Sequence, residues 1–425
     1  MKKAITFITV TFFLIKTGVI AQSCLTEGIT FTRQSEIDNF QNNYPNCSEI
    51  IGDVTIEEVF AMTINNLHGL SNVEAIGGDL TISNNFDLVN FVGLDNLESI
   101  GGHLKIVGNG TTQNLVGLGS LNQVGGDIKI YSNDIINLNG FGDVDVINGN
   151  LEIIQNYYLI SMNGLGGIDS ILGNLIVTDN LALEDISELG SLNYIGGCLT
   201  IKQNYVLPNL TGLENIDTIQ GDLVIHENYN LTNLQGLHNV SAIDGSIDIF
   251  NCFELQDLTG LSNMKTINGD LSIFLCGSLT SLNGLDSLDA STIENLALTN
   301  NTNLSECGIE SICNYLSNPN GTVTIECNYY GCNSESEVEE TCTVDFLEKQ
   351  VKTLQIFPNP ARNEINLING YLGQHLLIYT LTGQKIVEKR IENIKVDISK
   401  VPEGIYIVQI KLDKGYHRCL VMINR

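Results

Sequence analysis

A glycine recurs through most of the 425-residue chain at a nearly fixed interval, and this periodicity constrains the fold more than any other feature. Each copy opens a similar segment, such as GDLVIHENYNLTNLQGLHNVSAI from Gly221 to Ile243. The successive intervals are 26, 24, 24, 23, 24, 24, 24, 24 and 24 residues, for Gly52, Gly78, Gly102, Gly126, Gly149, Gly173, Gly197, Gly221, Gly245 and Gly269. A repeat of this length is typical of a solenoid in which each repeat forms one coil stacked on the last.

Two apolar residues in a Leu-x-Ile pattern follow each glycine. Because side chains alternate across a strand, both members of a pair face the same way, and we expect that face to be the core. The pairs are Leu80/Ile82, Leu104/Ile106, Ile128/Ile130, Leu151/Ile153, Leu175/Val177, Leu199/Ile201, Leu223/Ile225, Ile247/Ile249, Leu271/Ile273 and Leu296/Leu298. Later apolar residues fall every third position, which favours short strands and turns over a long helix. The sequence therefore predicts a mainly β solenoid of about 11–12 coils, a rod on the order of 50 Å long.

A polar residue occupies one register just after each predicted strand. Stacked side chains at this register can bond the turn backbone of neighbouring coils, so we interpret the column as an internal ladder and not as a ligand site. Two of its positions are Cys252 and Cys276, which we expect to be buried and reduced. The asparagines are Asn85, Asn109, Asn133, Asn156, Asn180, Asn204, Asn228 and Asn301.

Cysteines frame both ends of the predicted solenoid. Cys24 and Cys47 enclose a short predicted helix that begins with Ser35 as its cap, and a disulfide between them suits a lid over the first coil. At the other end, four cysteines allow three pairings, which the sequence leaves open: Cys307, Cys313, Cys332 and Cys342. They contain no C-x-x-C pair, so disulfides are favoured over zinc, and we expect no metal. Cys198, Cys327 and Cys419 have no assignable partner.

The solenoid resembles the receptor L-domain-like family, which is related to leucine-rich repeats, from about Cys24 to Cys342. The resemblance rests on the entry segment ITFTRQSEIDNFQNNYPNCSEIIGDVTI, on the repeated frame L-x-G-L-x-x-L-x-x-I-x-G-x-L-x-I, and on the closing segment LSECGIESICNYLSNPNGTVTIECN. The family implies a right-handed parallel β-helix with a binding role. It names no ligand.

The start of the chain predicts export. Residues 1–21 have a charged beginning, a short apolar run and a small residue before Gln22, as a secretory signal peptide does. The apolar run is too short to span a membrane, and no later stretch is long enough. Lipidation of Cys24 is the alternative, but Gln22-Ser23-Cys24 fits a lipoprotein signal poorly. We therefore expect domains at 1–21 (signal peptide), 22–345 (solenoid with its caps) and 346–425.

Charge changes sign between the two predicted domains. Residues 1–345 hold 8 Lys/Arg and 42 Asp/Glu, a net charge of −34, whereas residues 346–425 hold 12 and 7, a net charge of +5. An acidic rod repels phosphates, so we exclude nucleic acid as a partner. No Ca²⁺-binding loop pattern is present, and the acidic surface is best interpreted as a solvated one.

The last segment, from about Leu354, alternates apolar and polar residues between turns and predicts a small antiparallel β-sandwich. It resembles the C-terminal sorting domain of the type IX secretion system through FPNP, LTGQ, PEGIY and the closing VMINR. The resemblance implies that the secretion machinery is a partner, that the protein crosses the outer membrane, and that it is then released or attached to the cell surface. The residues expected to carry the sorting signal are Pro358, Asn359, Pro360, Gly383, Gly404 and Tyr406.

No catalytic motif is present: H-E-x-x-H, G-x-S-x-G and the P-loop are all missing, and the six histidines share no register. We therefore expect no enzyme and no cofactor. Two aromatic rows are the candidate ligand-binding residues, because flat apolar rings suit stacking on sugars or peptides. One row lies three residues past the strand start, with His226, Phe250 and Phe274, and with Tyr131 further along. The other lies just past the ladder, with Phe86, Tyr157, Tyr205, Tyr229 and Phe253.

These features predict a secreted or surface-attached protein that binds extracellular glycan or protein through the sheet face of its solenoid. One alternative is a purely structural or adhesive surface protein without a defined ligand. Another is a polysaccharide-active enzyme, which is disfavoured because residues 22–345 hold only five cations: Arg33, Lys105, Lys129, Lys202 and Lys265.

Overall fold

The computed structural model describes residues 22–59, 64–349, 354, 356–367, 371–411 and 416–424. The predicted signal peptide, residues 1–21, lies outside the described residues. Two hydrophobic cores are present, one formed by residues between Phe31 and Val338 and the other by residues between Leu354 and Ile423. In the described part of the chain, no helix has the length and apolar character needed to cross a bilayer.

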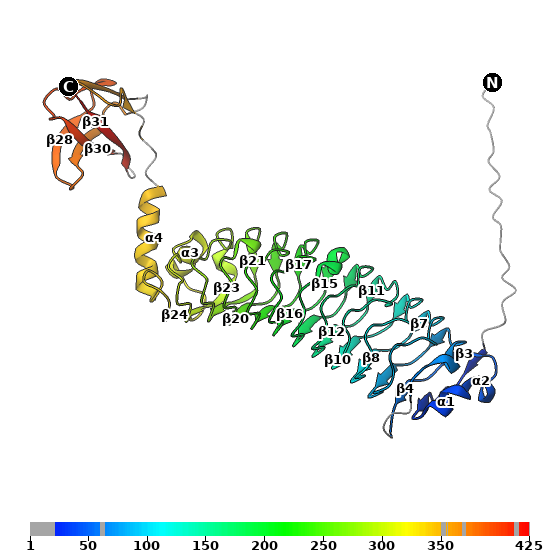
Figure 1. The fold of residues 1–425 in the computed structure, drawn as a ribbon. Coiled ribbons are helices and arrows are strands. Elements are labelled where there is room, and N and C mark those ends of the chain that lie inside the picture. Colours follow the sequence, from blue (N-terminus) through cyan, green and yellow to red (C-terminus); the bar gives the residue numbers. More distant parts are fainter. Residues whose placement is uncertain are drawn as a thin grey trace, which may run out of the picture.

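The solenoid is built from two long parallel sheets, as the glycine period predicts (Figure 1). Consecutive coils pair in register, so that Ile128 of one coil lies beside Leu104 on one side and Leu151 on the other. The 13-stranded sheet contains β2 (Ile29–Phe31), β4 (Val54–Glu57), β6 (Leu80–Ser83), β8 (Leu104–Val107), β10 (Ile128–Tyr131), β12 (Leu151–Ile154), β14 (Leu175–Thr178), β16 (Leu199–Lys202), β18 (Leu223–His226), β20 (Ile247–Phe250), β22 (Gly269–Phe274), β23 (Ile293–Thr299) and β24 (Val323–Glu326).

The second sheet has eleven short strands, most of them two residues long. It contains β1 (Gln22–Cys24), β3 (Cys47–Ile50), β5 (Ala75–Ile76), β7 (Ser99–Ile100), β9 (Gln123–Val124), β11 (Val146–Ile147), β13 (Ser170–Ile171), β15 (Tyr194–Ile195), β17 (Thr218–Ile219), β19 (Ala242–Ile243) and β21 (Thr266–Ile267). Short 3-10 turns lie between the sheets in some coils, at η1 (His68–Leu70), η2 (Ser187–Ser191), η3 (Thr259–Leu261) and η4 (Ala290–Thr292). The expectation of short strands and turns around a narrow core is thus confirmed.

The predicted inward pairs form the core, and each of their side chains is at most 1% exposed. Every strand of the type Leu-x-Ile-x buries its first and third residues, as alternation requires. The later apolar series Leu255, Leu258, Leu261, Met264 and Ile267 is fully buried as well. Each coil therefore fills its interior from both sheets and from the turns between them.

Small helices cover the ends of the solenoid. At the first coil lie α1 (Gln34–Asp38) and α2 (Phe40–Asn43), and at the last lie α3 (Glu310–Ser317) and α4 (Glu335–Lys349). The expectation that Ser35 caps the first helix is wrong, because α1 begins at Gln34 and Arg33 is at its N-cap position. The carboxylate of Glu36 instead accepts from the N–H of Thr32 at 2.7 Å, which satisfies the backbone at this helix start.

The cysteines of the caps are paired by the structure. Cys24 is bonded to Cys47, Cys307 to Cys332, and Cys313 to Cys342. The second bridge joins the segment before α3 to the segment after β24, and the third joins α3 to α4. Cys252 and Cys276 are free and buried, and Cys198, Cys327 and Cys419 are also free.

The C-terminal segment forms two antiparallel sheets that share one core. The three-stranded sheet has the order β25 (Ile356–Phe357), β26 (Glu364–Leu367) and β29 (Lys395–Asp397). The four-stranded sheet has the order β28 (Lys385–Arg390), β27 (His375–Thr380), β30 (Gly404–Lys411) and β31 (Tyr416–Ile423). This is the predicted small sandwich. The boundary expected at residue 345 falls inside α4, which continues to Lys349.

Candidate binding surface

The chain turns sharply at the end of each strand of the 13-stranded sheet, and both aromatic rows flank this corner. After the strands from β6 to β24 the corner residue has a left-handed backbone, with φ between 54° and 58° at Asn84, Ser132, Gln155, Asp179, Gln203, Glu227, Asn251, Leu275, Asn300 and Cys327. Glycine fills the equivalent place at Gly108, with φ of 67°. This conformation costs energy for most residues, so other interactions must stabilise it. The ladder residue, which comes next in the sequence, provides them.

The ladder residues lie inside the core and bridge successive coils. Asn180 donates through Nδ2 to the carbonyl oxygen of Ile153 at 2.8 Å, and its Oδ1 accepts from the N–H of Asn156 at 3.1 Å. All the asparagines proposed for the ladder are at most 2% exposed. The ladder also has a member that the sequence interpretation missed, because Asn328 accepts from the N–H of Asn301 at 2.9 Å. Because these asparagine side chains are buried, they cannot contact an external ligand.

The first aromatic row lies at the ends of three neighbouring strands, β18, β20 and β22. The rings of His226 and Phe250 meet edge to face at 5.4 Å, and those of Phe250 and Phe274 stack at 5.3 Å. His226 is anchored by its Nε2, which lies 2.8 Å from Oδ2 of Asp248. The three rings are half-buried and face away from the core. The structure therefore brings this predicted row together on the sheet.

The second row lies past the corner, in the turns and not on the sheet. Tyr205 and Tyr229 stack with nearly parallel rings, 4.7 Å apart, so each covers one face of the other. Phe253 meets Tyr229 at 6.4 Å with an angle of 73° between the rings, and it is 53% exposed. Tyr157 has the same register but lies two coils from Tyr205, with the exposed Leu181 between them. Phe86, the remaining member of the predicted row, lies further toward the first coil and is exposed. The predicted row is thus a contiguous cluster of three rings plus two separate rings.

Acidic side chains surround the second row. The pKa of Tyr205 is raised by partial burial, by Tyr229, and by the nearby carboxylates of Glu227 and Asp179. Glu227 is held by Gln203, whose Nε2 donates to Oε2 at 3.1 Å. These negative charges disfavour anionic ligands such as uronate or sulfated sugars.

A second ladder, at the residue after each repeat glycine, was missed by the sequence interpretation. Each side chain accepts a hydrogen bond from the backbone N–H of the next coil, as Asp79 does from His103 and Asn150 does from Asn174. The acceptors vary in type: Asp53, Asp79, His103, Asp127, Asn150, Asn174, Cys198, Asp222, Ser246, Asp270 and Asn295. The signal available in the sequence was a polar residue at a constant interval.

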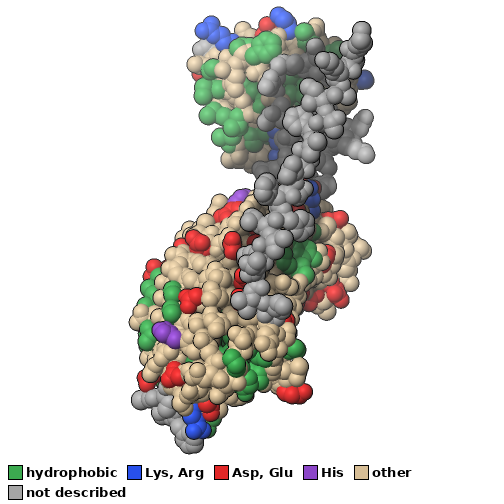
Figure 2. Space-filling view, turned by 90° about the vertical axis from the view of Figure 1, so that its right-hand side faces the viewer, with side chains coloured by type: hydrophobic (Ala, Val, Ile, Leu, Met, Phe, Trp, Pro, Cys, Tyr) green, Lys and Arg blue, Asp and Glu red, His purple; other side chains and the backbone are tan. Residues whose placement is uncertain are grey.

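The lysine side chains on the sheet face are largely paired with carboxylates of neighbouring coils. Nζ of Lys105 lies 2.8 Å from Oδ2 of Asp79, and Nζ of Lys129 lies 2.9 Å from Oε2 of Glu152. Figure 2 shows acidic side chains scattered over the solenoid, while the basic ones are concentrated on the C-terminal domain. This distribution leaves little cationic surface for an acidic substrate.

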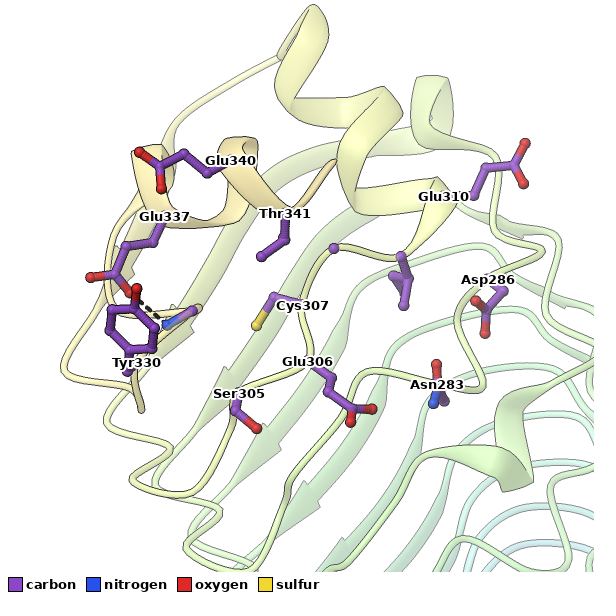
Figure 3. Close-up of a pocket in the computed structure, with 13 residues that line it drawn as sticks. Asn283, Asp286, Ser305, Glu306, Cys307, Glu310, Tyr330, Glu337, Glu340 and Thr341 are labelled. Atoms are coloured by element: carbon purple, nitrogen blue, oxygen red, sulfur yellow. Dashed lines mark hydrogen bonds between the residues drawn. The ribbon is translucent and has the colours of Figure 1, made fainter. Parts of the chain in front are cut away.

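A hollow of about 560 Å³ lies at the C-terminal end of the solenoid, beside α3 and α4 (Figure 3). Its rim carries Asp286, Glu306, Glu310, Glu337 and Glu340. Oε2 of Glu337 already accepts from the N–H of Gly331 at 2.7 Å, and Figure 3 shows Glu310 and Glu340 pointing away from the centre. Across the described residues, no group of three or more His, Cys, Asp or Glu side chains is arranged to hold a metal ion.

Residues proposed for the sorting signal have specific structural roles in the C-terminal sandwich. The side chain of Asn359 pairs with β31, because Nδ2 donates to the carbonyl of Leu420 and Oδ1 accepts from the N–H of Met422, both at 2.9 Å. The ring of Tyr406 lies against Gly404, where a Cβ would come within 3.3 Å of it. Gly383 has φ of 83° in the β27–β28 turn. The prolines Pro358 and Pro360 flank Asn359 in this segment.

Comparison with known families agrees with both parts of this architecture. Receptor L domain sequences match residues 46–104 and 169–253, and the secretion system C-terminal sorting domain matches residues 355–423. Parts of the solenoid are therefore similar to receptor L domains, and the C-terminal segment is similar to a type IX sorting domain. Neither matching family is a family of enzymes. A search of curated proteins gave no match.

Proposed function

We propose that this protein is exported by the type IX secretion system and binds an extracellular glycan or protein through the aromatic corner of its solenoid. The aromatic corner comprises His226, Phe250 and Phe274 on the sheet, and Tyr205, Tyr229 and Phe253 past the turn. The observation that carries the proposal is the exposure of Phe253 at the end of a stacked pair of tyrosines. Receptor L domains are associated with binding, and the sorting domain supplies the route out of the cell.

The surroundings of the aromatic corner favour a neutral ligand. A ring edge or face that is free of its neighbours can contact the apolar side of a sugar or a side chain of a peptide. Phe253 is turned out of the tyrosine stack and is expected to contribute most. Glu227 and Asp179 supply hydrogen-bond acceptors for hydroxyl groups while repelling anionic polymers.

A structural or adhesive role is the second candidate, and one observation favours it. The rings of Tyr205 and Tyr229 cover one another, as do those of Phe250 and Phe274, so part of their apolar surface already stabilises the stack of coils. Under this alternative, attachment to surfaces is broad, weak and dependent on salt. Under the proposed function, binding is saturable.

The deciding experiment is a glycan array probed with the chain from Gln22 onward. The variant is Tyr205→Ala/Tyr229→Ala/Phe253→Ala, and the matched control is Tyr158→Ala/Tyr329→Ala/Tyr330→Ala, which removes three exposed rings outside both aromatic rows. Saturable binding that only the first variant loses supports a glycan-binding corner. Loss in both variants, or retention in both, contradicts it. If no glycan binds, the glycan form of the proposal is wrong and a surface protein becomes the ligand to test.

A further inference from the structure

The four-stranded sheet of the sorting domain has an apolar patch on its solvent face. Ile405 of β30 pairs with Met422 of β31, and Ile407 pairs with Leu420 on one side and Tyr379 of β27 on the other. Ile405, Leu420 and Met422 are 45%, 58% and 44% exposed. Because these residues alternate with the buried Tyr406, Val408 and Val421, they point away from the core.

The outer face of the other sheet in the same sandwich is different in character. There the outward residues of β26 and β29 are Glu364, Asn366, Lys395 and Asp397, and Lys395 is paired with Glu364 at 3.3 Å. A solvated antiparallel sheet normally has such a polar outer face. Phe357 of β25, beside Asn366, is the exposed apolar residue on that face, and it stands among polar neighbours. The contiguous apolar patch on the four-stranded sheet indicates a surface that another molecule covers.

Charges adjoin the apolar patch along the strands. Two residues beyond the Ile407/Leu420 pair lie Gln409 and Arg418, and Lys411 follows at the end of β30. On the β28 side, Lys385 and Glu388 pair at 2.6 Å, and Nδ1 of His375 lies 3.8 Å from the same carboxylate. Lys411 and Arg418, together with Arg390 opposite His375 on β28, make this end of the face basic. Figure 2 shows hydrophobic and basic side chains on the surface of this domain.

We propose that this face, which we call the docking face (Tyr379, Ile405, Ile407, Leu420 and Met422, with Lys411 and Arg418 beside them), binds a protein component of the secretion system. Charge complementarity and the flat apolar centre define that partner as an apolar surface bordered by acidic residues. The proposal rests on the sorting function of the domain. It is independent of ligand binding by the solenoid.

The test is export of the full chain in a bacterium with a type IX secretion system. The apolar variant is Ile405→Ser/Met422→Ser, and its control is Leu372→Ser/Ile394→Ser, two exposed apolar residues outside the docking face. The charge variant is Lys411→Glu/Arg418→Glu, with Lys389→Glu/Lys400→Glu as control. We expect the exported fraction, measured by immunoblot, to fall at least about tenfold in both variants and to stay within about twofold of wild type in the controls. Equal export of variants and controls overturns the proposal.

Further arms separate the remaining explanations. Melting curves of the purified chains check folding, and the milder Ile405→Thr/Met422→Gln replaces the apolar variant if that one is unfolded. Vesicles of phosphatidylglycerol that bind the wild type but not the variant identify a lipid surface, and a wild-type dimer that the variant abolishes identifies a second copy; either result overturns the protein partner. If deletion of residues 354–425 leaves export intact, the sorting function itself is wrong.

Discussion

Oδ1 of Asn204 accepts a hydrogen bond from the backbone N–H of Asn180, one coil earlier, at 3.2 Å. Its Nδ2 donates to the carbonyl oxygen of Val177 in that same coil at 2.9 Å. One buried side chain thus satisfies a donor and an acceptor that the turn would otherwise leave unpaired inside the core. Repetition of these two hydrogen bonds in successive coils keeps the left-handed corners, and hence the aromatic corner, in register.

Asn204→Ala is expected to destabilise the solenoid by about 2–4 kcal/mol, because it leaves two buried backbone groups without partners. The change is measured from the midpoint of urea unfolding followed by circular dichroism. The control is Asn230→Ala, an exposed residue whose Nδ2 donates to the carbonyl of Val206 at 3.2 Å, and it is expected to cost less than about 1 kcal/mol. Equal midpoints for the two variants would contradict the role of the ladder.

The parts of the fold that depend on periodicity were predictable from the sequence. Alternation placed the inward pairs, and a constant interval of about 24 residues placed the coils in register. The second ladder was missed because its members are different residue types and share only the ability to accept a hydrogen bond. His103 accepts through Nδ1 and Cys198 accepts through Sγ. Where only one atom of a side chain is used, the residue type predicts the position of a ladder poorly, and the constant interval between polar residues predicts it better.

Features that depend on the third dimension were not predictable. The pairing of Cys307 with Cys332 depends on the path of the chain through the C-terminal cap, which spacing does not encode. The register of Tyr205 and Tyr229 predicted a row, but whether the rings stack on one another depends on their rotamers. That outcome decides how much ring surface is left for a ligand.

Asp79 is expected to make part of the stability depend on pH. Partial burial raises the pKa of Asp79, but the hydrogen bond from the N–H of His103 and the ion pair with Lys105 outweigh it and lower the pKa below 3.8. A lowered pKa in the folded state contributes stability above the unfolded pKa, and this stability is lost as pH falls through the folded value. Asp79→Asn keeps the Oδ1 acceptor, so it is expected to cost below about 1 kcal/mol near pH 7.

Urea midpoints near pH 7 and near pH 2.5 measure this dependence. The difference in urea midpoint between wild type and Asp79→Asn is expected to become smaller at the lower pH, where protonation of Asp79 is favoured. Asp222→Asn is the matched control, because Asp222 occupies the same ladder register, accepts from the N–H of Ser246, and has no lysine partner among the described residues. A gap for Asp79→Asn that stays constant with pH would rule out the ion pair as its cause.

The five free thiols are expected to react at different rates with a thiol reagent near pH 8. Cys327 is exposed and reacts first. Burial raises the pKa of Cys419 to about 11, which lowers its thiolate population about a hundredfold and slows its reaction. Cys252 is protected twice, because the hydrogen bond with Cys276 and burial both raise its pKa. Mass spectrometry of the labelled peptides gives the order, and early labelling of Cys252 would contradict its place in the ladder.

The last prediction concerns the asparagine between the two prolines of the tail. The side chain of Asn359 makes the hydrogen bonds that a neighbouring strand would make to β31. Its Nδ2 donates to the carbonyl of Leu420 and its Oδ1 accepts from the N–H of Met422, both at 2.9 Å. Asn359→Asp keeps the acceptor but turns the donor into a carboxylate oxygen that faces the carbonyl of Leu420, so we expect a loss of about 1–3 kcal/mol in the stability of the sandwich. Protease digestion of the full chain measures this loss as faster cleavage within residues 354–425. Asn363→Asp adds the same charge at an exposed position and is expected to leave the cleavage rate unchanged. Because β31 also carries Leu420 and Met422, a freed β31 disturbs the docking face, and Asn359→Asp is therefore expected to reduce export together with stability.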